Sequence, residues 1–279
     1  MYHQLSVVVI VFYFIFCFLP TTLFSSPITT HGGSHHCDKR YNETIGSYEL
    51  HNNILDSANG FGTQCIEGSE KGSNGGIAWE AKWTWNEPNS FKAFPHIEYI
   101  IDQQYALKNI QHISFTWNWS YEIITMTNGD KYSNKDIQQP KGKENEEEFK
   151  ANVAFELLTY SLQTGAVDYQ IRIWLGIFGD DIDTLGEEVV DKTFNHDGAQ
   201  WILYKGKNTK LTIYTLVPKE RKNIISMFHG DALPYFNYLV ENDYIPSNDP
   251  QGLFKLRAGS QVYAGKNMRF ITHFFSVKI

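Results

Sequence analysis

The stretch Ile77-Ala-Trp-Glu-Ala-Lys-Trp-Thr-Trp85 places an apolar residue at every second position. A period of two is typical of a β-strand whose two faces meet different surroundings. Similar runs recur along the chain between turns rich in Gly, Asn and Lys, at residues 113–119, 153–159, 169–175, 201–204, 211–217, 254–256 and 269–277. Many short strands at regular spacing predict an all-β sandwich, most simply a β-jelly-roll of two curved antiparallel sheets.

One segment departs from the strand pattern. Residues 231–242 carry Leu233, Phe236 and Leu239 near helical spacing, and Asp231 stands where a carboxylate favours a helix N-terminus. We therefore predict one helix packed beside the double sheet. The acidic run at 141–150 is typical of a solvated loop. Because the chain shows no internal repeat and no convincing linker, residues 37–279 are predicted to form a single domain.

The amino-terminal part differs in composition from the rest. Residues 5–19 form an apolar run that is followed by Pro20. This run is shorter than the roughly 20 residues of a membrane-spanning helix, so residues 1–26 are predicted to be a signal peptide. The run lacks a positively charged flank, which leaves an uncleaved anchor as the alternative. We expect a secreted, extracellular protein with no membrane association after the signal is removed.

Residues 27–36 are predicted to be a flexible leader, since Gly, Ser and Thr dominate them without an apolar period. Three histidines in this leader could bind a metal, but they are more simply a solvated tail: His31, His35 and His36.

Three cysteines are present, and Cys17 lies in the predicted signal peptide. The remaining pair, Cys37 and Cys65, is expected to form a disulfide in an oxidising compartment. Two glycosylation sequons, at Asn42 and Asn118, agree with secretion, although the second lies within a predicted strand.

The composition limits the classes of ligand. The formal charge of −7 argues against nucleic acid, because phosphate binding needs clustered Lys and Arg. The chain has no phosphate-binding glycine loop, no Gly-x-Ser-x-Gly elbow and no His-Glu-x-x-His pair. Aromatic residues make up 15% of the chain, and aromatic faces stack on sugar rings. We therefore expect a neutral polysaccharide ligand, no metal, no cofactor and a monomeric protein.

From about Cys37 to Ile279 the chain resembles glycoside hydrolase family 12, whose members are β-jelly-roll endo-β-1,4-glucanases and xyloglucanases. The resemblance is carried by several blocks in the order of the family: Gly60-Phe-Gly-Thr-Gln-Cys65, residues 77–85 with Phe91-Lys-Ala-Phe-Pro95, residues 113–121, Tyr169-Gln-Ile-Arg-Ile-Trp-Leu-Gly176, Tyr235-Phe-Asn-Tyr-Leu239 and Ala258-Gly-Ser-Gln-Val-Tyr-Ala-Gly265. The resemblance implies a β-1,4-glucan or xyloglucan as ligand.

The resemblance also identifies two departures at the catalytic positions. The family retains anomeric configuration with one Glu as nucleophile and a second Glu as general acid/base, roughly 5 to 5.5 Å apart. The matching positions are Gln170 and Gln261. A neutral amide supplies neither a nucleophilic carboxylate oxygen nor a proton for the leaving group. The resemblance therefore predicts a catalytically impaired member.

Other departures fall around the same site. Arg172 stands where the family usually has Met, and Leu55, in Asn53-Ile-Leu55, stands where a sugar-stacking Trp is usual. Val262 follows Gln261 in place of the usual Pro. Glu156 takes the place of an Asp that supports the nucleophile, and it is the best surviving candidate acid. The residues expected to contact a glucan are Asn53, Leu55, Trp119, Arg172, Trp174 and Tyr263.

Three functions remain open at this point. The leading hypothesis is a secreted pseudoenzyme that binds glucan without cleaving it. The first alternative is a decoy that presents the family's outer surface to protein inhibitors. The second is an active endo-β-1,4-glucanase that uses relocated carboxylates such as Glu156 with Asp168. Turn or surface roles are the default for Asp168, Asp180 and Asp181.

Overall fold

The computed structural model describes residues 35–55, 62–71, 75–86, 90–127, 131–136, 149–179 and 182–279. The predicted signal peptide at 1–26 lies outside these residues, and so does the leader apart from His35 and His36. Asp180, Asp181 and most of the acidic run also lie outside them. The chain divides into two units, Met1–Gly32 and Gly33–Ile279, and the second contains every described residue. In this described part, no helix has the length and apolar character needed to cross a membrane.

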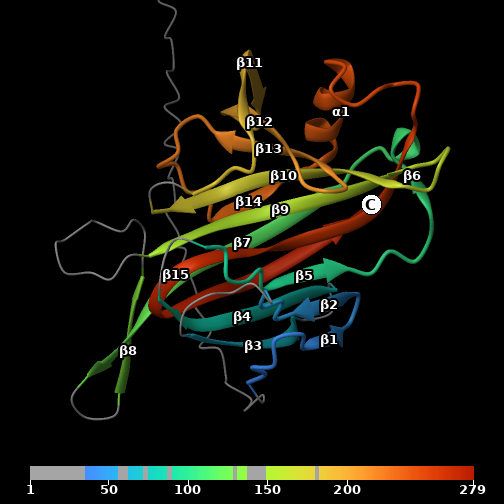
Figure 1. Ribbon diagram of the computed structural model, residues 1–279. Helices are drawn as coiled ribbons and strands as arrows, with labels where there is room; N and C mark the ends of the chain where they lie inside the picture. Colours follow the sequence, from blue (N-terminus) through green and yellow to red (C-terminus); the bar gives the residue numbers. More distant parts are fainter. Residues whose placement is uncertain are drawn as a thin grey trace, which may run out of the picture. The chain divides into compact units, whose positions relative to one another are not determined.

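The described residues form fifteen strands, one α-helix and one short 3-10 helix, η1 (Leu107–Asn109) (Figure 1). Sheet 1 has the order β1-β2-β5-β15-β9-β10-β13-β12-β11. Its strands are β1 (Asn42–Ile45), β2 (Tyr48–His51), β5 (His96–Tyr99), β9 (Lys150–Ser161), β10 (Val167–Phe178), β11 (Glu187–His196), β12 (Ala199–Lys207), β13 (Thr212–Pro218) and part of β15 (Gln251–Lys278), with β6 (Tyr105–Ala106) also paired to β15. The predicted all-β class is confirmed.

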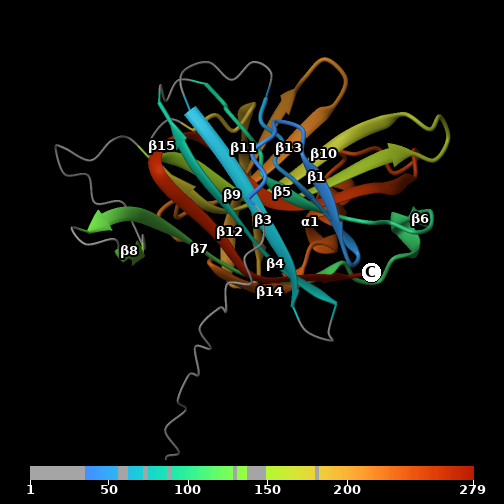
Figure 2. The ribbon, with the colours of Figure 1, turned by 90° about the horizontal axis from the view of Figure 1, so that it is seen from below.

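Sheet 2 contains the remaining strands and the rest of β15. They are β3 (Gly62–Lys71), β4 (Gly76–Trp85), β7 (Ser114–Thr127), β8 (Lys131–Asp136) and β14 (Met227–Asp231). β4 and β7 both pair with β15, and β14 and β8 pair with β7. Figure 2 shows β3 and β4 in front of β9 and β12 of sheet 1, so these parts of the two sheets lie in separate layers.

A single strand, β15, joins the two sheets. Its first part pairs with β9 as far as Ala264. Its second part pairs with β4 from Gly265 onward and with β7 from Met268 onward. The sequence predicted two separate strands at 254–256 and 269–277, and the continuous strand corrects this prediction. The chain changes sheet at Gly265 and Asn267, whose φ angles are 145° and 53°. Glycine suits this bend because a Cβ there would lie 2.6 Å from the Met268 side chain.

The core lies between the two sheets and is rich in aromatic side chains. Phe115 of β7 stacks on Phe155 of β9 with ring centroids 4.1 Å apart, which is a direct contact between the layers. Trp117, Trp119 and Tyr121 follow along β7 on the same buried face. Their burial fixes which face of each strand points inward, and it leaves the opposite face of sheet 1 for polar side chains.

The predicted helix is confirmed as α1 (Leu233–Glu241). Leu233, Phe236 and Leu239 are buried, as their spacing predicted. The Asp231 carboxylate accepts hydrogen bonds from the backbone N–H groups of Leu233 at 2.9 Å and Ile113 at 2.8 Å. Asp231 therefore ties the start of the helix to the segment that leads into β7.

The predicted disulfide between Cys37 and Cys65 is also present. It fixes the beginning of the described chain to β3. Just before it, His36 pairs with Ile66 through the backbone and stacks on Tyr41 with ring centroids 3.8 Å apart. The last residues assigned to the flexible leader are therefore bound to the sheet.

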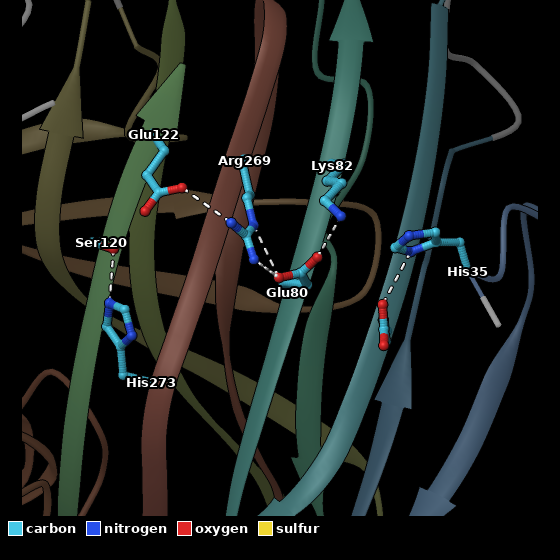
Figure 3. Close-up of polar contacts among 8 residues, drawn as sticks. His35, Glu80, Lys82, Ser120, Glu122, Arg269 and His273 are labelled. Atoms are coloured by element: carbon cyan, nitrogen blue, oxygen red, sulfur yellow. Dashed lines mark hydrogen bonds and ion pairs between the residues drawn. The ribbon is translucent and has the colours of Figure 1, made fainter. Parts of the chain in front are cut away.

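The solvent-facing side of sheet 2 carries a charged ladder (Figure 3). The Arg269 guanidinium bonds Glu80 through Nε at 2.9 Å and through Nη2, and its Nη1 lies 3.2 Å from Glu122. Lys82 completes the ladder at 2.7 Å from Glu80. Burial alone would raise the pKa of Glu80, but the bonds from Lys82 and Arg269 outweigh burial and lower this pKa. The ladder therefore crosses β7, β15 and β4.

We predict that Arg269→Met lowers the free energy of unfolding by about 1–3 kcal/mol at pH 7, because two carboxylates lose a charged donor. Since the folded-state pKa of Glu80 is depressed, this contribution is present above the unfolded pKa of about 4.3 and is lost as pH falls through the folded value. Urea denaturation at pH 7 and pH 3 measures both effects. The exposed Lys207→Met is the charge-matched control, and an equal loss in both variants at pH 7 would contradict the prediction.

Candidate functional site

The predicted catalytic positions lie on the face of sheet 1 that points away from the core. On β10, Ile171 and Ile173 face the core, so alternation places Gln170, Arg172 and Trp174 on the opposite face. β9 lies between β10 and β15. The register pairs Arg172 with Glu156 on one side of β9 and Gln261 with Asn152 on the other. Residues from three strands therefore meet over β9.

Glu156 is the centre of this group, although its side chain is only 1% exposed. Gln170 donates from Nε2 to Glu156 Oε2 at 2.9 Å, and Gln261 donates from Nε2 to Oε1 at 3.4 Å. Both predicted catalytic positions thus bond the same carboxylate. Carboxylates at positions 170 and 261 could not donate these hydrogen bonds when ionised, whereas the amides can.

Asn152 fixes the orientation of one amide. Its Nδ2 donates to Gln261 Oε1 at 2.6 Å, which leaves Gln261 Nε2 to face Glu156. Asn152 is fully buried and stands four residues before Glu156 on the same face of β9. The sequence analysis did not single out Asn152. The alternation that places Glu156 on this face was the signal that could have found it.

Arg172 supplies the positive charge opposite Glu156. Its Nε lies 3.3 Å from Glu156 Oε1, and its Nη2 donates to Gln170 Oε1 at 3.5 Å. The Nε contact is an ion pair without good hydrogen-bond direction, and Nη1 has no hydrogen-bond partner among the described residues. An unpaired carboxylate at this depth would be costly. Arg172 therefore balances the buried charge of Glu156.

The charged row continues beyond Glu156 toward the other edge of the sheet. The register places Arg257 of β15 opposite Glu156, but its Nε bonds Glu98 of β5 at 2.9 Å. Lys255 Nζ lies 2.6 Å from the other oxygen of Glu98. Burial alone would raise the pKa of Glu98, and these two cations instead lower it. The charges on this face are thus paired with one another.

The remaining predicted contact residues fall around this network, with one exception. Trp174 is fully buried against Ile182 and Val217, and its indole Nε1 has no hydrogen-bond partner in the described chain. Tyr263 is half-buried beside Trp174, and burial raises the pKa of its phenol to about 12. A further aromatic contact comes from Phe91, whose ring centroid lies 5.5 Å from that of Tyr263.

Asn53 and Leu55 lie at the Gln261 end of the network. The backbone of Ile54, between them, bridges Ala93, which in turn bridges Val262. Leu55 is half-buried, and its N–H donates to the Lys92 carbonyl at 2.9 Å.

Trp119 does not belong to this face. It is 2% exposed and packs between the sheets against Phe178 and Phe270. The prediction that Trp119 contacts a glucan is therefore wrong, because alternation along β7 assigns its ring to the core. Alternation alone predicts two faces but does not say which of them is buried.

Asp168 is also remote from Glu156. It lies four residues before Arg172, the register partner of Glu156, which is about 13 Å along the strand. Burial and the neighbouring Asp249 charge raise the pKa of Asp168. The two carboxylates proposed for the active alternative are thus too far apart for a retaining pair.

Comparisons with known proteins all point to one family. A family model described as glycosyl hydrolase family 12 matches residues 142–279. A probable xyloglucan-specific endo-beta-1,4-glucanase A from Aspergillus terreus is 27% identical over 247 residues, which cover 87% of this chain and 86% of that protein. A Phytophthora nicotianae protein named inactive glycoside hydrolase XLP1 is 29% identical over 238 residues, which cover 84% and 87%.

A solved structure agrees with these matches. The catalytic domain of Humicola grisea Cel12A, in complex with a soaked thio-cellotetraose, superposes with a TM-score of 0.69 at 25% identity, covering 88% of this chain and 98% of that domain. The sequence blocks, the two-sheet fold and the position of Gln170 and Gln261 on one face all agree with this relationship. The chain is therefore similar to glycosyl hydrolase family 12, whose model matches residues 142–279.

Proposed function

We propose that this protein is a secreted glucan-binding pseudoenzyme, which takes up a β-1,4-glucan or xyloglucan without hydrolysing it. The observation that carries the proposal is the buried Glu156 carboxylate, which accepts amide hydrogen bonds from both Gln170 and Gln261. A retaining glycosidase needs an ionised nucleophile and a protonated acid at these two positions. Two amides meet neither requirement.

Glu156 is a poor substitute for the missing groups. It is buried and ion-paired with Arg172, so its oxygens are committed to structure. Its suggested partner, Asp168, lies about 13 Å away along the strands. Losing general acid/base assistance alone costs about 10²- to 10⁴-fold in rate, and losing the nucleophile adds to this. These points support a protein without hydrolase activity.

Glucan binding has separate support. The amides of Gln170 and Gln261 have the size of the carboxylates they replace and can hydrogen-bond sugar hydroxyls. The solved structure of the Humicola grisea relative is a complex with a soaked thio-cellotetraose. The Phytophthora nicotianae relative bears the name of an inactive glycoside hydrolase, which agrees with a non-hydrolysing member of this family.

A second candidate function is the binding of an inhibitor protein as a decoy. The site observation that favours it is the replacement of a sugar-stacking Trp by Leu55, which weakens the case for a complete glucan site. The oxygen atoms of Glu156 are also occupied by Gln170, Gln261 and Arg172. This function would use the outer surface of the family rather than the site face.

Reducing-sugar release from xyloglucan, mixed-linkage β-glucan and carboxymethylcellulose tests the catalytic part of the proposal. We expect no release by the wild type. We expect the double variant Gln170→Glu/Gln261→Glu to release reducing sugar at least about tenfold more slowly than a triple variant that also carries Arg172→Met. The reason is that Arg172 would pair with the carboxylate introduced at position 170. Release by the wild type would contradict the proposal.

The matched control for the added charges is Gln103→Glu/Gln104→Glu, which changes two exposed glutamines. Like the wild type, this control should release no reducing sugar.

Calorimetric titration with cello- and xyloglucan-oligosaccharides tests the binding part. We expect saturable binding by the wild type without product formation. If no β-glucan binds, the glucan-binding proposal fails, and affinity capture of inhibitor proteins becomes the test of the decoy function.

The pairing of Arg172 with Glu156 predicts non-additive stability effects. Arg172→Met should lower the free energy of unfolding by about 3–5 kcal/mol, because it leaves a buried carboxylate without its cation. Adding Glu156→Gln removes that charge, so the double variant should be at least about 1 kcal/mol more stable than the sum of the single losses. Urea denaturation of the four proteins at pH 7 measures this coupling, and additive losses would refute the pairing.

A further inference from the structure

Four potential metal ligands, Glu49, His51, His96 and Glu98, form a square on two neighbouring strands, at a separate place from Glu156. On β2 and β5 the register pairs His51 with His96 and Glu49 with Glu98. Leu50 and Ile97, which lie between them, face the core, so all four side chains project from the site face of sheet 1. Ligands two residues apart on one strand and opposite each other on the next can converge on one point above the sheet.

The Nε2 atoms of His51 and His96 are both available to bind a metal ion. His96 is 4% exposed, and its Nδ1 hydrogen-bonds the Phe94 carbonyl at 2.7 Å. Because the carbonyl can only accept, Nδ1 carries the proton and Nε2 keeps its lone pair. His51 Nε2 is buried without a hydrogen-bond partner in the described chain, although Glu49 Oε2 lies 3.3 Å away. One ligand atom each from His51, His96 and Glu98 lies within 4.8 Å of the others.

We propose that His51, His96 and Glu98 form a binding site for a divalent transition-metal ion of the zinc type, with Glu49 as the fourth available ligand. Two imidazole nitrogens and a carboxylate oxygen suit Zn²⁺ and its neighbours. Mg²⁺ and Ca²⁺ prefer sites made of oxygen atoms. The proposal does not depend on glucan binding.

The surroundings of the three ligands resemble the supporting shell of metal sites. Ligating histidines usually donate their second ring N–H to a carbonyl or carboxylate, as His96 does to Phe94. Glu98 is held by Lys255 and Arg257. The His51 and His96 rings lie parallel with centroids 4.8 Å apart, so binding requires rotation about χ2, which is a soft torsion.

The same two cations limit the affinity of the site. Lys255 and Arg257 each occupy one oxygen of Glu98, and a divalent ion must bind beside them or displace one. Lys255 is the more exposed, at 30% of its side chain, and it can move into solvent. A neutral residue at position 255 should therefore increase the affinity.

Calorimetric titration of the full mature protein, free of any affinity tag, with ZnCl₂ tests the site. We expect one ion per chain with micromolar affinity, and no heat of binding with MgCl₂. His51→Gln should weaken Zn²⁺ binding at least tenfold, and Lys255→Gln should strengthen it about threefold or more. Near-ultraviolet circular dichroism checks that His51→Gln is folded. The Lys255→Gln gain needs no loss of structure, so it remains informative if His51→Gln fails to fold.

Two controls separate this site from other histidines. His35→Gln tests a second group, formed with Glu67 and Glu80, whose Glu80 is already bonded to Lys82 and Arg269. His112→Gln changes a histidine whose side chain is 71% exposed. Both should bind Zn²⁺ as the wild type does. Absence of Zn²⁺ binding, its loss in His35→Gln instead of His51→Gln, or unchanged affinity in Lys255→Gln would overturn the proposal.

Discussion

A carboxylate buried in the middle of a β-sheet needs donors and a positive charge, and Glu156 meets this need through its neighbours. Two amides donate to it, and Arg172 pairs with it. Each partner comes from a strand that flanks β9, so the register of three strands is tied to one charge. Gln170, Arg172 and Gln261 act together, because each of them contacts the carboxylate oxygen atoms of Glu156.

The core does not share in this arrangement. Aromatic packing between the sheets involves the opposite face of β9 and β10, where Phe155, Ile171 and Ile173 lie. The continuous strand β15 then carries Gln261 to the site in sheet 1 and Phe270 to the core in sheet 2. The packing of the core therefore does not depend on which side chains the site face carries.

The strands with clean alternation, including 77–85 and 169–175, were predictable from the sequence, and so were the helix and the disulfide. The resemblance supplied the two Gln positions. Alternation could not assign Trp119 to the core, and it could not show that β15 is one strand, because Gly265 and Asn267 looked like a turn. Pairings such as Glu156 with Arg172 depend on the register between strands, which a single sequence does not contain. The signal peptide remains a prediction.

The central claim is that this chain has no functional nucleophile. Retaining enzymes of this kind form a stable covalent intermediate with an activated 2-deoxy-2-fluoro cello-oligosaccharide, because the fluorine slows hydrolysis of the glycosyl-enzyme. Intact-protein mass spectrometry after incubation with this reagent is the most direct test. The account predicts no increase in mass. An adduct that peptide mapping assigns to Glu156 or Asp168 would contradict it.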